Sequence, residues 1–185
     1  MNIDETYMSR ALQLAKNGFG RVSPNPMVGA VVVADGRIIG EGFHRQWGHA
    51  HAEVTAIASV AEADRRLLRQ STIYVTLEPC SHYGKTPPCS KLIIDTGIPR
   101  VVVGCLDPFK EVSGRGIKML REAGVDVTTG VLERQCQWIN RKFMTAHTLR
   151  RPYVTLKWAE SADRFVASDG SREIAVISST TTMTL

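Results

Sequence analysis

The stretch TIYVTLEPCSHYGKTPPCSKLIIDTGIPRVVVGC, residues 72–105, predicts a strand, a loop, a helix and a second strand in that order. The runs at 72–77 and 100–105 are short and apolar, which is typical of buried strands. A helix is predicted to begin near Pro88, because proline suits the first turn of a helix, and to end at Gly97. Strands that alternate with helices in this way indicate an α/β fold.

The sequence on both sides continues this alternation. Asp35-Gly36 is a two-residue hairpin signal, so the two strands next to it should pair antiparallel and the sheet should be mixed. We therefore expect a three-layer αβα sandwich around a mixed sheet of about five strands. The further strands are predicted at 28–34, 37–43 and 125–129, and the further helices at 4–17, 51–63, 116–123 and 133–149.

Three side chains near the centre of the chain have the character of a zinc site. His51 offers a nitrogen ligand, and Cys80 and Cys89 offer two thiolates. Three protein ligands are typical of a catalytic zinc, which keeps a fourth position open, and this nitrogen and sulfur set suits zinc better than magnesium or calcium. Glu53 is not needed as a ligand, and we predict that it shuttles protons beside the metal.

The predicted elements place these residues at two helix starts. His51 and Glu53 fall in the first turn of one helix, and Cys89 falls near the start of another. Helix N-termini carry partial positive charge and free N–H groups, which lower the pKa of a nearby thiol. The motif thus lies where thiolates are favoured.

Composition narrows the class of protein. The chain of 185 residues is 43% apolar and 22% charged, with no apolar run long enough to span a membrane. Its N-terminus is acidic and lacks an apolar signal core, so we expect a cytoplasmic protein. The net charge is +5, but positive and negative residues are interspersed along the chain and aromatic residues are few. This pattern argues against a nucleic-acid partner.

The four cysteines fit a reducing compartment. A disulfide between Cys80 and Cys89 is the alternative to a metal site, and a reducing cytosol makes it the weaker one. Cys105 and Cys136 are predicted to be core residues.

His51-Ala52-Glu53 followed by T-L-E-P-C-S-H-x-G-x-T-P-P-C at 76–89 resembles the zinc-dependent base deaminases. Eight residues separate Cys80 from Cys89, where the short form of that motif has two. With this spacer, the sequence is similar to the deaminase domain of the bacterial bifunctional riboflavin-biosynthesis deaminase/reductase. S-P-N-P-M-V-G-A-V at 23–31 and Asp107-Pro108 extend the resemblance to about residues 4–150.

The resemblance implies a cytidine-deaminase-like fold, one zinc ion per chain and Glu53 as the catalytic proton shuttle. It also implies hydrolytic deamination of the phosphorylated pyrimidine 2,5-diamino-6-(5-phosphoribosylamino)pyrimidin-4(3H)-one in riboflavin biosynthesis, with release of ammonia. The substrate-binding residues that it implies are Asn25, His44, Ala52 through its backbone N–H, His82 and Lys85.

Several of these residues also have a plain structural interpretation. Asn25 can be a turn residue that bonds its own backbone, His44 a structural or exposed histidine, and Lys85 a solvent-facing loop lysine. Asp107 is predicted mainly to cap a turn. For Asn25 and Lys85 the resemblance favours the functional interpretation.

The predicted domains are a zinc-dependent deaminase at 1–150 and, at 151–185, the start of a truncated reductase domain or a partly disordered tail. NADP(H) belongs only to a complete reductase domain, so we do not expect this chain to use it. A homo-oligomer is left open. Two other functions are also left open: a nucleoside or tRNA base deaminase, and a structural zinc module, which a fourth protein ligand would favour.

Overall fold

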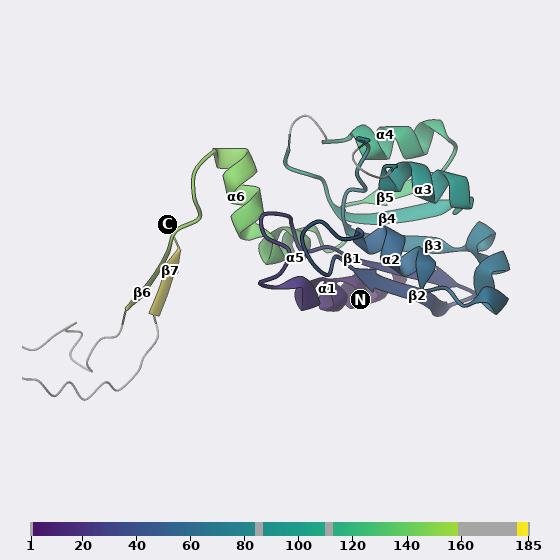
Figure 1. Cartoon of the computed structure of the whole chain (residues 1–185), viewed down its shortest axis with the longest axis horizontal. Helices are drawn as coiled ribbons and strands as arrows, with labels where there is room; N and C mark the ends of the chain where they lie inside the picture. The colour runs from purple at the N-terminus through teal and green to yellow at the C-terminus, as the bar shows by residue number, and fades with distance from the viewer. Residues whose placement is uncertain (1, 84–86, 110–112, 159–180, 185) are drawn as a thin grey trace, which may run out of the picture.

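A mixed five-stranded sheet in the order β2-β1-β3-β4-β5 forms the centre of the fold (Figure 1). The computed structural model describes residues 2–83, 87–109, 113–158 and 181–184. β1 pairs antiparallel with both β2 and β3, whereas β3, β4 and β5 run parallel. The strands are β1 (Gly29–Ala34), β2 (Arg37–Phe43), β3 (Thr72–Leu77), β4 (Arg100–Cys105) and β5 (Asp126–Thr129).

The predicted hairpin joins β1 to β2. Asp35 and Gly36 both have positive φ, of 51° and 71°, as the tight two-residue turn requires. Ala34 pairs with Arg37 directly across this turn, and the register shifts between Val32 and Val33. The hairpin makes the sheet mixed, as the sequence predicts.

Helices cover both faces of the sheet, which gives the three predicted layers. On one face lie α2 (Ala52–Ala58), α3 (Cys89–Thr96) and α4 (Arg115–Glu122), and on the other lie α1 (Ile3–Ala15) and α5 (Glu133–Ile139). Figure 1 shows α3 and α4 above the sheet and α1 below it. Successive residues of β4 alternate between the layers: Val101 and Val103 pack under α3 and α4, and Val102 packs against the α1 side.

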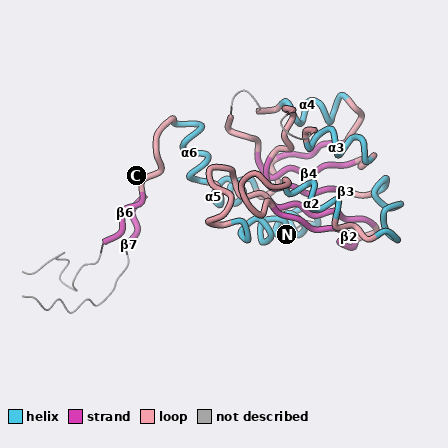
Figure 2. The backbone as a smooth tube through the Cα atoms, in the orientation of Figure 1, coloured by secondary structure: helices cyan, strands magenta, loops and turns pink. Residues whose placement is uncertain are grey.

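Two helix predictions need correction. The helix predicted at 51–63 ends at Ala58, and a 3-10 helix, η2 (Glu62–Gln70), follows it. The helix predicted at 133–149 is two helices, α5 and α6 (Arg141–Leu149), as Figure 2 shows. The break falls at Asn140, whose φ of −105° is not helical. The Asn140 side chain instead accepts from the N–H of Met27 at 2.7 Å and donates to its carbonyl at 2.8 Å, so a tertiary contact ends the first helix.

The C-terminal part forms a separate two-stranded sheet. β6 (Thr155–Trp158) pairs antiparallel with β7 (Thr181–Thr184). The assignment of 151–185 to the start of a reductase domain or to a partly disordered tail stays a prediction. One short 3-10 helix, η1 (Lys16–Gly18), completes the elements of the described residues. No helix among these residues has the length and apolar character needed to cross a bilayer.

Candidate metal centre

The three predicted metal ligands lie together at one end of the sheet. The ligand atoms of His51, Cys80 and Cys89 all lie within 4.8 Å of one another. The Nδ1 atom of His51 is 3.6 Å from the Sγ atom of Cys80 and 3.4 Å from that of Cys89. His51 and Cys89 are 38 residues apart in the sequence, so it is the fold that brings the group together.

Each ligand has a definite place in the fold. His51 is the residue just before α2, and Cys89 is the first residue of α3, preceded by Pro88. Cys80 follows the end of β3. The structure therefore confirms that two helix N-termini meet at the ligand group.

The surroundings of Cys80 favour a thiolate. Its Sγ atom accepts a hydrogen bond from the backbone N–H of Cys89 at 3.3 Å. Contact with the Cys89 thiol, together with His51, lowers the pKa of Cys80 to about 4. The negative sulfur of Cys80 in turn raises the pKa of Cys89. Without a cation, the two sulfurs would share one proton, and a divalent ion would allow both to be ionised.

The donor set fits zinc. One imidazole nitrogen and two thiolates within a single coordination sphere are a set that zinc prefers. In the described part of the chain the group has three members, and no fourth His, Cys, Asp or Glu joins it. Three protein ligands are the number that catalytic zinc sites commonly have, and a closed structural site has four.

Glu53 lies beside this group and is almost completely buried, at 3% exposed. It is in the first turn of α2, two residues after His51. Burial, and after it the negative charge of Cys80, raise the pKa of Glu53 to about 7. A carboxyl group with a pKa near neutrality can both accept and release a proton, as the predicted shuttle must.

Two of the predicted substrate-binding residues, Asn25 and His44, are hydrogen-bonded to each other next to His51. His44 is buried, and its Nδ1 lies 3.1 Å from the carbonyl oxygen of Ala50, so Nδ1 carries the proton. Its Nε2 then accepts from the Nδ2 of Asn25 at 3.3 Å. Burial lowers the pKa of His44, which keeps the ring neutral. The His44 ring meets that of His51 edge-on, with 5.6 Å between the centroids.

The structure shows fewer contacts for the other predicted site residues. Ala52 is buried as the first residue of α2, so its N–H has no partner within the helix. His82 is exposed, two residues after Cys80. Lys85 lies outside the described residues. Asp107 accepts from the N–H of Phe109 at 2.9 Å, which is the turn-capping role that the sequence predicts for it.

The sequence did not predict a role for Glu78 or Asn140, whose side chains bond the backbone of segments next to the site. Glu78 is buried and accepts hydrogen bonds from the chain that follows β4. Asn140 fixes the backbone of Met27, two residues after Asn25. The partners of both lie far away in sequence. The available signal is a polar residue within or beside an otherwise apolar element.

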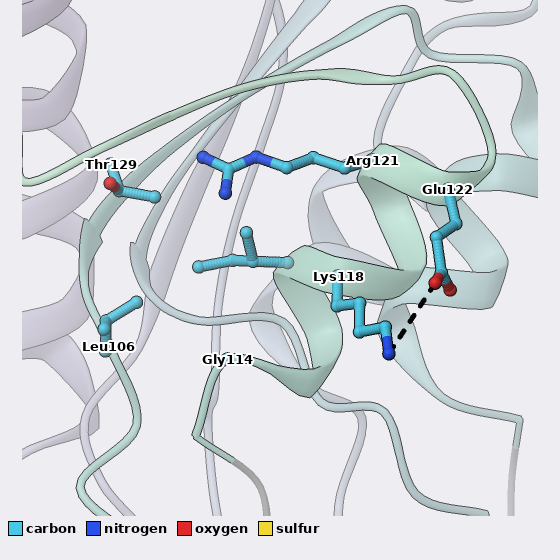
Figure 3. A pocket seen from close by; sticks show the side chains of 7 residues that line it. Leu106, Gly114, Lys118, Arg121, Glu122 and Thr129 are labelled. Carbon is cyan, nitrogen blue, oxygen red and sulfur yellow. Dashed lines mark ion pairs between the residues drawn. The ribbon is translucent and has the colours of Figure 1, made fainter.

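A pocket of about 340 Å³ lies against α4 and β5, and none of the three metal ligands lines it. Figure 3 shows the side chains that line this pocket. Lys118 pairs there with Glu122 at 3.8 Å, and Arg121 donates to the carbonyl of Val127. Since no metal ligand lines the pocket, we assign the chemistry to the His51 group. The pocket is lined by Leu106, Gly114, Ile117, Lys118, Arg121, Glu122 and Thr129.

The family model described as the cytidine and deoxycytidylate deaminase zinc-binding region matches residues 1–105. The chain belongs to this family of zinc-binding deaminases. The matched range includes all three proposed ligands and Glu53.

Within the family, the chain is similar to the riboflavin biosynthesis protein RibD. RibD of Aquifex aeolicus is 46% identical over 185 residues, which cover 95% of this chain and 51% of that protein. RibD of Escherichia coli is 44% identical over 160 residues, which cover 86% and 42%. The chain thus spans about half the length of the curated relatives it matches.

Solved structures agree with this likeness. A Thermotoga maritima protein named diaminohydroxyphosphoribosylaminopyrimidine deaminase/5-amino-6-(5-phosphoribosylamino)uracil reductase superposes with a TM-score of 0.83 and is 52% identical, over 87% of this chain and 46% of that one. The Rib2 deaminase of Aspergillus oryzae, solved in complex with DARIPP, has a TM-score of 0.62 and 25% identity, over 79% and 94%. The predicted cytidine-deaminase-like α/β fold is confirmed.

Proposed function

We propose that this chain catalyses the hydrolytic deamination of 2,5-diamino-6-(5-phosphoribosylamino)pyrimidin-4(3H)-one, with release of ammonia, as a step of riboflavin biosynthesis. The observation that carries the proposal is a three-ligand zinc site with a buried Glu53 beside it, in a chain 52% identical to a deaminase/reductase named for this substrate class. His51, Cys80 and Cys89 would hold the metal. When bound, zinc supplies an activated water molecule as the nucleophile.

Glu53 moves the protons of the reaction. Its carboxylate takes a proton from the attacking water, whose oxygen bonds to the ring carbon that carries the 2-amino group. The carboxyl gives this proton to the adjacent ring nitrogen. The carboxylate then takes the second proton of the same oxygen and gives it to the amino group, which leaves as ammonia as the C–N bond breaks and the C=O bond forms. The pKa of about 7 that burial gives Glu53 suits both directions of transfer.

Asn25 and His44 orient the ring in this proposal. Because the amide Nδ2 of Asn25 donates to His44, the Oδ1 atom of Asn25 is directed by that bond and is the acceptor offered to an amino or ring N–H group. The neutral His44 holds this orientation through its second bond to Ala50. The backbone N–H of Ala52 is the donor for a ring carbonyl.

The spacer between the two cysteines supplies the remaining proposed contacts. His82 and Lys85 both belong to it, so they are tethered to the ligand group at each end. A lysine ammonium suits the phosphate or a ring carbonyl of the substrate. We propose both residues as substrate contacts.

The experiment that tests this function is a comparison of three substrates. The zinc-loaded protein is incubated with the diaminopyrimidine ribosyl phosphate, with cytidine and with a tRNA anticodon stem, and ammonia is measured. We expect release with the first substrate alone. Release with cytidine or the tRNA stem would replace the proposed substrate, and no release from any of them would favour a structural zinc module.

A further inference from the structure

The carboxylate of Glu78 joins the metal-ligand loop to the segment after β4. Glu78 is 4% exposed and lies two residues before Cys80. Its Oε2 atom accepts from the N–H groups of Asp107 at 3.3 Å and Gly114 at 2.9 Å, and its Oε1 atom accepts from that of Gly116 at 3.0 Å. Three backbone donors thus converge on one buried side chain.

The backbone of the same residue is also fixed. The N–H of Glu78 donates to the carbonyl of Cys105 at 2.9 Å, which continues the pairing of β3 with β4. A Cβ atom at Gly116 would lie 2.0 Å from the carbonyl oxygen of Pro79, so α4 approaches this peptide as closely as a glycine allows. The two residues before Cys80 therefore have little freedom to move toward α4.

Cys80 is held from the other side by α3. The hydroxyl of Ser90 donates to the carbonyl of Cys80 at 2.9 Å, and the N–H of Ser90 lies 3.2 Å from the same oxygen. Ser90 is fully buried. Cys80 itself is only partly buried, so its position depends on these two anchors.

We propose that Glu78 is a positioning residue for the metal ligand Cys80. Its carboxylate ties the residues before Cys80 to the start of α4, and Ser90 completes the restraint from α3. Cys80 is the ligand that lies in a loop, whereas His51 and Cys89 are held at helix starts. Residues that orient metal ligands in this way commonly change metal affinity 10- to 100-fold when they are replaced. The inference rests on the zinc site of the proposed function.

The test compares Glu78→Gln with Asp4→Asn. Asp4 is a partly buried carboxylate that, like Glu78, accepts several hydrogen bonds, but its partners, Arg100 and Tyr74, lie away from the metal ligands. Zinc release to a chelator is measured for both variants, and the absorption bands of bound Co²⁺ report the geometry of the thiolate ligands. Both readouts are taken without substrate.

We expect Glu78→Gln to release zinc about 10- to 100-fold faster and to alter the thiolate-to-cobalt bands, while Asp4→Asn behaves as wild type in both. Glu78→Asp keeps the charge but is one methylene shorter, and it replaces Glu78→Gln if the latter does not fold. Unchanged release and unchanged cobalt bands would overturn the positioning role. A wild-type protein that failed to deaminate the pyrimidine would overturn the proposed function and leave these metal measurements intact.

Discussion

The Nε2 atom of His44 lies 3.3 Å from the side-chain Nδ2 atom of Asn25, although 19 residues separate them. Burial lowers the pKa of His44 and keeps the ring neutral, so this nitrogen can accept the amide proton. One contact therefore fixes which way the Asn25 amide faces and links two predicted substrate contacts into one unit beside His51.

Replacing Asn25 with alanine should impair substrate handling more than folding. Asn25→Ala removes a ring contact and leaves the buried Nε2 of His44 without its donor, so we expect kcat/KM to fall by about 10- to 100-fold. Steady-state ammonia release measures the effect. Asn17→Ala, at an exposed asparagine of η1, is the matched control and should leave kcat/KM unchanged. Equal activity of the two variants would remove Asn25 from the site.

Replacing the carboxylate of Glu53 should stop the chemistry and preserve the metal. Glu53→Gln keeps the shape of a buried side chain but cannot take up the water proton, so we expect kcat to fall by about 10²- to 10⁴-fold. Zinc content, measured by atomic absorption, should stay at one ion per chain. A variant that remained active would show that another group shuttles the protons.

The contact between α2 and β2 should be sensitive to a single methyl group. A Cβ atom at Gly42 would lie 2.3 Å from the backbone nitrogen of Ala56 and 2.6 Å from the carbonyl oxygen of Ala52. Gly42→Ala must therefore push α2 away, and we expect a loss of about 1–3 kcal/mol in the free energy of unfolding, together with weaker zinc binding, since His51 begins α2.

Gly104→Ala is the control for this variant. Its Cβ atom would lie 2.3 Å from the Sγ atom of Cys136, which packs on the opposite face of the sheet. It should cost a similar free energy in urea denaturation without weakening zinc binding in a chelator titration. If both variants bound zinc equally well, the metal site would not depend on how closely α2 sits on β2.

The pair formed by Asp4 and Arg100 should make stability depend on acid pH. Arg100 donates to Asp4 at 3.0 and 2.8 Å, and this contact lowers the pKa of Asp4 below its ordinary value of 3.8. Because the pKa is lower in the folded protein, the stabilisation is present above the ordinary value and is lost as the pH falls through the folded one. We expect Asp4→Asn to cost about 1 kcal/mol near neutral pH.

That difference should shrink toward zero as the carboxyl is protonated in both states. Urea denaturation of wild type and Asp4→Asn at about pH 7 and about pH 3 measures it. A gap of equal size at both pH values would assign the effect to packing and not to the charge of Asp4.

The sequence predicts most of the sheet because the strands are short apolar runs with clear ends. The predicted bounds 72–77 and 100–105 are those of β3 and β4. The end of a helix is harder to predict where a contact with a residue far away in the sequence determines it. Asn140 breaks the helix predicted at 133–149 because its side chain bonds Met27, 113 residues away, and no local pattern carries that information.

The same distinction applies to the site. The ligand group could be predicted because the choice of residue types and the spacing of His51, Cys80 and Cys89 reflect the metal itself. The role of Glu78 could not, because its three donors come from residues 107–116 and meet it only in the folded chain. The roles of His82 and Lys85 stay predictions.

The two ends of the spacer between the cysteines are fastened to each other. The N–H of Cys89 bonds the sulfur of Cys80, and the N–H and hydroxyl of Ser90 lie at the carbonyl of Cys80. The segment that joins the two cysteines therefore begins and ends at one fixed point. Such a segment can change in length and sequence at small energetic cost without moving the sulfurs apart. Under the proposed function, the substrate contacts in this segment can therefore differ between deaminases while the metal ligands keep their places.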